Sequence, residues 1–472
     1  MRGFSHELQN VVQTGVGFLC ILFAFLSQSF IEQSVISSAA EKQGISEHAG
    51  YRSLAIVYFF FFIGNFLAVP IIEHTSAKWC MAVGGMCYAV FQVGFLHLNE
   101  YYLYASSAIV GFGASILWTG QGNYLTLIST GDNSRRNSGV LWAIFQGSIS
   151  SGGVFLLCIF TFVSAGQNIS ESAVKTLYTV FTAVTVVGVV VLALLRNPVQ
   201  EKPKEHQTLG KTIGKLLKLI NLGSTFGINL LGSTFELLLT RRMFLLAFAF
   251  GFTGFETTMW SGVYPTVISF TTRLGSNTNA LVATYAINAG IGQILGGCVF
   301  GVLGEKTKRL GRENIVLCGM VLHLITFLGI FVNFPAKASL HSTDEIGLIE
   351  PSIVIAMSCG FLLGLCDSIW NTQLYAFLVD NYKTQSSQAF AIFKSYQALC
   401  SCLAFFYGSL INLNWHLIIL AVVAVLGAVG FYWCEKEIEN EEKTSSQLEE
   451  TGKEAMSYTF AVDLCVDERL TV

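Results

Sequence analysis

The stretch that decides the fold is residues 53–72, which read SLAIVYFFFFIGNFLAVPII. It carries no charged side chain, and a helix of about 20 apolar residues crosses the ~30 Å hydrocarbon core of a bilayer. The rest of the chain has the same character, because 53% of its 472 residues are hydrophobic and only 12% are charged. An average soluble domain is about 25% charged. The composition therefore excludes a soluble enzyme, a disordered scaffold and a secreted disulfide-rich protein.

Further apolar stretches of similar length bring the number of predicted spans to twelve. They cover residues 10–30, 53–72, 78–97, 103–128, 137–163, 174–195, 243–270, 280–303, 314–334, 352–378, 386–411 and 415–434. Strands of a membrane barrel would alternate over about ten residues instead of forming such continuous runs. We therefore predict an all-α polytopic membrane protein embedded in a lipid bilayer.

Polar residues follow the first span directly, namely Gln28, Glu32 and Gln33. A secretory signal peptide ends in a cleavage site of small residues, which this position lacks. We therefore expect the first span to stay in the protein as a helix.

Lys and Arg residues predict the orientation. If both termini face the cytoplasm, 21 of the 27 lie in cytoplasmic segments, 5 lie in outer segments, and Lys394 lies within a span. This excess on one side is the pattern that sets the orientation of multi-pass proteins. The acceptor sequence Asn168-Ile169-Ser170 then falls outside, where Asn168 is a candidate for glycosylation. We expect cytoplasmic termini and residence in the plasma membrane rather than in endolysosomes.

The spans predict four regions along the chain. A six-helix bundle covers 1–195, a cytoplasmic middle loop covers 196–242, and a second six-helix bundle covers 243–434. The cytoplasmic tail, 435–472, carries 11 acidic and 4 basic residues and lacks apolar periodicity. Such a composition predicts disorder.

Short matches relate the two bundles. Leu117-Trp118-Thr119-Gly120-Gln121 in span 4 matches Ile369-Trp370-Asn371-Thr372-Gln373 in span 10, and Ala143-Ile144-Phe145-Gln146 in span 5 matches Ala391-Ile392-Phe393-Lys394 in span 11. A weaker match joins Ile63-Gly64-Asn65 in span 2 to Ile291-Gly292-Gln293 in span 8. Matches in the same order indicate two parallel six-helix repeats. This is the organisation of the major facilitator fold, whose site lies at the repeat interface near the membrane midplane.

Charged side chains within the spans are the first candidates for a functional site, because a charge inside a membrane is costly. Glu256 lies in span 7, Asp367 in span 10 and Lys394 in span 11. From the helical rise, Asp367 and Lys394 lie ~16 Å and ~12 Å from the inner ends of their spans. We therefore predict an intramembrane ion pair between Asp367 and Lys394, acting either at a solute site or as a static lock. Glu256 has no assignable partner and is either a proton carrier or a structural residue.

Amide side chains complete the candidates for a central cavity. Asn371 lies one helical turn after Asp367, and Gln121 and Asn123 lie in span 4. These amides either line the cavity or hold neighbouring helices together. His323, the single histidine of span 9, is expected to be an ordinary core residue.

No residues show the spacing of a metal site, a phosphate-binding loop or a nucleophile with its base. We therefore predict a protein without enzymatic activity, catalytic residues, metal or cofactor. The net charge of −3 and the lack of a basic domain also argue against a nucleic-acid partner.

Longer motifs resemble a known family. They are Leu117-Trp118-Thr119-Gly120-Gln121-Gly122-Asn123, Arg136-Asn137-Ser138-Gly139, Ser261-Gly262-Val263-Tyr264, Gly364-Leu365-Cys366-Asp367-Ser368, Asn371-Thr372-Gln373-Leu374 and Ala389-Phe390-Ala391-Ile392-Phe393-Lys394. These motifs resemble the uncoordinated-93-like family, an atypical branch of the major facilitator superfamily, and most of all its animal major-facilitator-domain-containing subgroup. The resemblance implies twelve helices in a major facilitator fold. It also implies an accessory role, since members are known mainly as regulators of a muscle potassium channel or as escorts of membrane receptors.

One departure from the superfamily concerns the loop between spans 2 and 3. Transporters usually carry a gating loop of the type Gly-x-x-x-Asp-Arg there, but this chain reads Pro70-Ile71-Ile72-Glu73-His74-Thr75. The first interpretation is therefore an accessory regulator or trafficking partner of an ion channel, with a potassium channel as the leading candidate. The alternative is a secondary transporter of a small solute, proton-coupled through Glu256.

Overall fold

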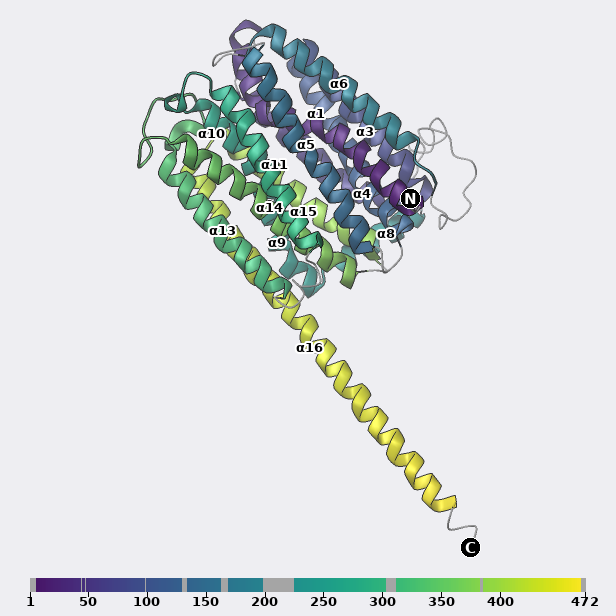
Figure 1. Ribbon diagram of the computed structural model, residues 1–472. Coiled ribbons are helices and arrows are strands. Elements are labelled where there is room, and N and C mark those ends of the chain that lie inside the picture. The colour runs from purple at the N-terminus through teal and green to yellow at the C-terminus, as the bar shows by residue number, and fades with distance from the viewer. Residues whose placement is uncertain are drawn as a thin grey trace, which may run out of the picture.

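The structure, a computed structural model, describes residues 6–43, 45–46, 48–97, 99–129, 134–162, 169–197, 225–302, 311–382 and 385–467. Twelve helices in these ranges are long and apolar enough to cross a membrane. Each overlaps one of the predicted spans, which confirms the all-α polytopic fold. Figure 1 shows these helices packed side by side in one bundle, with one helix projecting far beyond it.

The first half of the bundle contains six long helices. They are α1 (His6–Gln43), α2 (Ala49–His74), α3 (Ala77–Gly94), α4 (Glu100–Ile128), α5 (Ser134–Phe162) and α6 (Glu171–Ala193), with a short 3-10 turn, η1 (Phe95–His97), after α3. Local capping determines where two of them begin. The side chain of Asn99 accepts from the backbone N–H groups of Tyr101 and Tyr102, and Ser170 accepts from that of Ala173.

The second half is preceded by α8 (Thr225–Leu238). It consists of α9 (Arg241–Thr258), η2 (Met259–Val263), α10 (Tyr264–Phe270), α11 (Thr278–Val302), α13 (Arg312–Asn333), α14 (Ile353–Asn381), α15 (Ser386–Gly408) and α16 (Leu413–Asp467), with 3-10 turns η3 (Thr272–Leu274) and η5 (Ala336–Ser339). Span 7 is thus α9, η2 and α10 in succession. The wide π turn η2 lies just before Pro265. Proline lacks the backbone N–H that a continuous α-helix would use at this position, and the π turn accommodates it.

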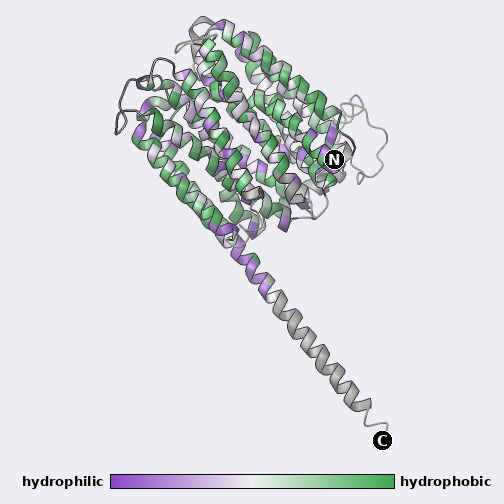
Figure 2. Ribbon diagram, viewed as in Figure 1, coloured by the Kyte–Doolittle hydropathy of each residue, from purple (hydrophilic) through white to green (hydrophobic). Residues whose placement is uncertain are grey.

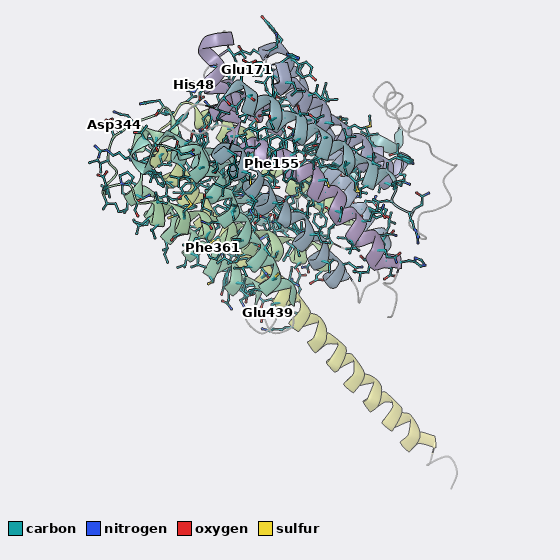
Figure 3. The ribbon with its side chains drawn as sticks, turned by 45° about the horizontal axis from the view of Figure 1, so that its top comes forward. His48, Phe155, Glu171, Asp344, Phe361 and Glu439 are labelled. Carbon is teal, nitrogen blue, oxygen red and sulfur yellow. The ribbon has the colours of Figure 1, made fainter. Side chains whose placement is uncertain are left out.

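The two ends of the bundle can be told apart by the direction of the helices. We call the end at which α1 and α9 begin the inner end, and the end at which α2 and α11 begin the outer end. In Figure 3, His48, Glu171 and Asp344 mark the outer end and Glu439 marks the inner end.

Apolar side chains cover the outside of the bundle. Val187 and Ile325 are each 55% exposed and Val354 is 74% exposed. Figure 2 shows hydrophobic residues throughout the bundle and hydrophilic residues where α16 leaves it. Lipid tails are as apolar as these side chains, so this surface suits the interior of a bilayer.

The halves meet along two helix pairs, α2 against α15 and α5 against α11. Within the second half, α14 packs chiefly against α11 and α13, whereas α15 packs against α9. A glycine allows the close contact between α14 and α11, because a Cβ at Gly364 would lie 1.9 Å from the carbonyl oxygen of Ala289. Although α14 and α15 are consecutive in the chain, they are therefore not close neighbours.

Two expectations about the connecting regions need correction. The middle loop contains a helix, α8, whose Phe235 stacks on Phe66 of α2 with ring centres 5.6 Å apart. The tail was expected to be disordered, but α16 continues without a break to Asp467. Glu and Lys favour helices, and Glu439 pairs with Lys436 and Lys443 at helical spacing. Residues 198–224 of the loop and Asn168 lie outside the described residues.

Candidate functional site

A central cavity of about 120 Å³ lies between the two halves. Its lining comes from α1 to α5 on one side and from α9, η2, α11, α14 and α15 on the other. Most lining side chains are apolar or aromatic. The polar ones, apart from Tyr and Trp, are Gln146, Thr257, Gln293, Asp367, Asn371, Lys394 and Gln397. The cavity therefore combines an apolar wall with a few polar groups and two opposite charges.

Asp367 and Asn371 form one polar unit on α14. The Nδ2 atom of Asn371 donates to Oδ1 of Asp367 over 2.8 Å and to its backbone oxygen over 3.0 Å. The two side chains are only 4% and 5% exposed, and both line the central cavity. The two residues therefore lie on one face of α14, and the hydrogen bond holds one face of the carboxyl group in place.

Glu256 contacts this unit from behind the cavity wall. Its neighbour Thr257 lines the cavity, whereas Glu256 itself is fully buried and is not among the lining residues. The carboxyl groups of Glu256 and Asp367 are neighbours. Oε2 of Glu256 has no hydrogen-bond partner, and a bond to Asp367 would satisfy it. Such a bond between two carboxyl groups needs a proton on one of them. The two residues, which we call the carboxyl dyad, can therefore hold an exchangeable proton.

His323 is the partner of Glu256 that could not be assigned from the sequence. Its Nε2 lies 3.3 Å from Oε1 of Glu256, and its Nδ1 lies 3.1 Å from the backbone oxygen of Gly319. That backbone oxygen can only accept, so Nδ1 carries a hydrogen and Nε2 faces the carboxyl group. His323 is thus a member of the site rather than an isolated core residue. This role can be recognised only from the contact between the α9 and α13 side chains, because the two residues lie far apart in the chain.

Lys394 is held by groups other than Asp367. Its Nζ donates to Oε1 of Gln397 over 2.8 Å, and it lies 5.3 Å from the ring centres of both Trp118 and Tyr375. Lys394 and Asp367 line the same cavity but do not form the predicted ion pair. The prediction assumed that consecutive spans pack together, whereas α14 and α15 have different main neighbours.

A smaller space lies next to the central cavity and shares two of its residues, Trp118 and Lys394. Gln121 and Asn123, predicted for the central cavity, line this smaller space instead. On α4, α14 and α15 its lining residues are displaced toward the inner end, so we call it the inner space.

The boundary between these two spaces is aromatic. Tyr375 lines the inner space, and its ring centre lies 5.0 Å from that of Trp142, which lines the central cavity. Trp118, Trp142 and Tyr375, together with Lys394, form what we call the aromatic layer. Because Trp118 and Trp142 belong to the first half and the other two to the second, the layer joins the halves.

At the outer end the halves touch directly. The hydroxyl groups of Ser34 and Ser269 lie 3.1 Å apart, and the hydroxyl of Tyr51 donates to the backbone oxygen of Ser339 over 3.4 Å. These contacts join α1 to α10 and α2 to η5. The outer side of the cavity is therefore bounded by contacts between the halves.

A buried acidic residue in the first half was missed. α1 extends beyond its predicted end, and Glu32 within it is fully buried. Nε2 of Gln28 donates to Oε2 of Glu32 over 3.2 Å. The pair is satisfied only in part, because Oε1 of Gln28 and Oε1 of Glu32 are buried without a hydrogen-bond partner. A count of apolar residues cannot register such a pair. The spacing of Gln28 and Glu32, one helical turn apart, was the signal in the sequence that could have indicated a buried polar pair.

Comparison with known proteins places this geometry in context. A family model described as "Ion channel regulatory protein UNC-93" matches residues 41–432. UNC93-like protein MFSD11 of Xenopus laevis is 33% identical over 436 residues, which cover 91% of this chain and 96% of the relative. Protein unc-93 homolog A of Bos taurus is 26% identical, over 90% of this chain and 93% of the relative.

A solved structure shares the fold. The crystal structure of the peptide transporter POT in complex with alafosfalin aligns with a TM-score of 0.62, over 91% of this chain and 95% of that chain. The two sequences are only 11% identical, so the likeness shows a common fold and nothing further.

Proposed function

Because this chain belongs to the UNC-93 family and has the major facilitator fold, we propose that it is a non-enzymatic secondary transporter of a small polar solute. The observation that carries the proposal is that Asp367 and Lys394 face one central cavity without pairing with each other. A static lock would pair the two charges directly. Unpaired opposite charges in a membrane interior are costly, and a solute with matching groups compensates them.

The transport cycle alternates the opening of the two ends. We take the bundles 1–195 and 243–434 as the moving bodies. The outer contacts through Ser34 and Tyr51 would break when the outer end opens, and the aromatic layer would separate when the inner end opens. We assign the coupling of this cycle to a proton to the carboxyl dyad, because two neighbouring buried carboxyl groups favour holding one proton between them.

Uptake into proteoliposomes tests this function. The purified full-length protein is reconstituted, exposed to a mixture of small metabolites, and the contents of the vesicles are measured by mass spectrometry. We expect at least one polar solute to accumulate, and to do so less in Asp367→Asn. Glu345→Gln, which neutralises an exposed carboxylate on the outer side, is the matched control and should keep full uptake. Equal contents in protein-containing and protein-free vesicles would refute transport.

Regulation of an ion channel is the second candidate, with a potassium channel as the first partner to examine. It is favoured by the description of the matching family model and by α16, which projects beyond the bundle (Figure 1). Recovery of a channel in near one-to-one amount from native membranes in mild detergent would support this role. Recovery of the protein alone would contradict it.

The orientation of the protein in the membrane and its cellular location are also part of the proposal. The distribution of Lys and Arg supports cytoplasmic termini and an outer, glycosylated Asn168. We further propose residence in the plasma membrane. Treatment with a glycosidase should shift the electrophoretic mobility of the parent protein but not of Asn168→Gln. An unshifted parent protein would contradict the outer position of this loop.

A further inference from the structure

Two N–H donors in the central cavity have no hydrogen-bond partner. Nε2 of Gln293 and Nε1 of Trp260 are both unpartnered, and their side chains are 1% and 6% exposed. Buried polar groups in folded proteins are nearly always satisfied. Both nitrogen atoms can only donate. Both nitrogen atoms have almost no accessible surface, so a molecule in the cavity reaches them only by displacing part of the wall, and it would then have to offer acceptor oxygens.

The charges of the cavity restrict the solute further. A purely cationic solute would meet the ammonium group of Lys394, and a purely anionic solute would meet the carboxylate of Asp367. Like charges that meet in a low-dielectric site oppose binding strongly. A solute that carries one charge of each sign compensates both residues at once.

The apolar part of the cavity wall indicates what the uncharged part of the solute is like. The rings that line the cavity include Phe25, Phe61, Phe145, Trp118 and Trp142. An apolar or aromatic body gains free energy by leaving water for such a surface.

We propose that the cavity binds a zwitterion of the amino-acid type with a large apolar side chain, which names the solute class of the proposed transport function. Its ammonium group binds Asp367 beside Asn371, and its carboxylate oxygens accept from Lys394. The apolar side chain lies among the rings. Gln397 keeps the ammonium group of Lys394 in place at the cavity wall.

Four probes with the same aromatic body separate the charges. L-phenylalanine has both charges, N-acetyl-L-phenylalanine lacks the ammonium group, L-phenylalaninamide lacks the carboxylate, and 2-phenylethanol lacks both. Ligands that bind only the folded state raise its unfolding temperature. In thermal unfolding of the purified full-length protein, we expect L-phenylalanine to bind about tenfold or more tightly than the other three. L-leucine and L-tryptophan extend the test to other zwitterions.

Two variants should change which of the phenylalanine-related probes binds best. In Asp367→Asn only Lys394 remains charged, so N-acetyl-L-phenylalanine should stabilise at least as well as L-phenylalanine. In Lys394→Met the same should hold for L-phenylalaninamide, while Glu345→Gln should keep the parent preference. Each variant is compared with its own unfolding temperature without ligand, so altered folding does not obscure the outcome.

The outcomes separate this inference from transport itself. Stabilisation by none of the three zwitterions, or by all four phenylalanine-related probes equally, would overturn the inference. Preferential zwitterion binding without uptake would support the inference and reject transport. Uptake of a solute that lacks one of the charges would support transport and reject the inference.

Discussion

The ammonium group of Lys394 in the second half lies 5.3 Å from the ring centre of Trp118 in the first half. Both residues line the central cavity and the inner space. The contact therefore joins the halves at the boundary between the two spaces, on the inner side of the candidate solute site. A desolvated contact between a cation and an aromatic ring contributes about 2 kcal/mol.

Removing this ring should open the inner side of the cavity. We expect Trp118→Ala to raise the rate at which a thiol reagent, added from the inner side, modifies a cysteine introduced by Gln146→Cys. A loss of about 2 kcal/mol changes an equilibrium about thirtyfold, so the rate should rise by up to about that factor. Trp433→Ala, at a ring that is 60% exposed on the outside of the bundle, is the matched control and should leave the rate unchanged. An unchanged rate in Trp118→Ala would show that the aromatic layer is not the barrier.

Glu256 and His323 should act as a pair in stability. Glu256→Leu and His323→Leu each leave a buried polar partner unsatisfied and should cost about 1–3 kcal/mol, measured by thermal unfolding in detergent. The double variant should lose less than the sum of the two single variants. Additive losses would show that the 3.3 Å contact contributes nothing to stability.

Glu256→Gln separates the folding role of this residue from a proton role. The amide keeps a hydrogen-bonding group opposite His323, so the unfolding temperature should stay close to that of the parent. The amide cannot release a proton, so proton-driven uptake should be lost while exchange of solute across the membrane persists. Proton-driven uptake at the parent rate would remove the carboxyl dyad from the mechanism.

Two glycines should respond in opposite ways to a single added methyl group. Gly364→Ala drives a Cβ into the backbone of α11 and should destabilise the protein by about 1–3 kcal/mol, as overpacking typically does. A Cβ at Gly122 would meet nothing within 4 Å, so Gly122→Ala should be neutral or stabilise helix α4 by up to about 1 kcal/mol. Unfolding temperatures of the two purified variants check this contrast, and equal shifts would contradict the packing of α14 on α11.

Removal of the projecting part of α16 should distinguish the two candidate functions. Up to Glu441 the helix is tied to the bundle, since that residue pairs with Arg242 and Glu435 pairs with Arg312 at 3.2 Å. Deleting 445–472 should therefore leave folding and solute uptake unchanged. If the protein regulates a channel through this helix, the deletion should abolish recovery of the channel in a pull-down. Loss of uptake with retained folding would instead assign the projecting helix a part in transport.

Two of the sequence matches between the halves contain residues that line the central cavity, although Gln146 and Gln293 were not predicted as site residues. The match between the segments ending in Gln146 and Lys394 relates two residues that both line the central cavity. The match in spans 2 and 8 points to Gln293, which lines it as well. The correspondence is only partial, because Asn65, the counterpart of Gln293, is fully buried and does not line the cavity. The repeats did not predict which side chains contact each other, because those contacts also depend on how each helix is rotated about its axis in the packed bundle.

The sequence by itself determined the number of spans, the all-helical fold and the presence of charges inside the membrane. Length, hydropathy and repeat order are properties of the chain taken one segment at a time, and the bilayer converts them directly into helices. Only the tertiary structure decided that Lys394 contacts Gln397 and Trp118 instead of Asp367, and that Glu256 meets His323. Those partners depend on which helices pack together and on how each is rotated, and close packing between residues distant in the chain sets both.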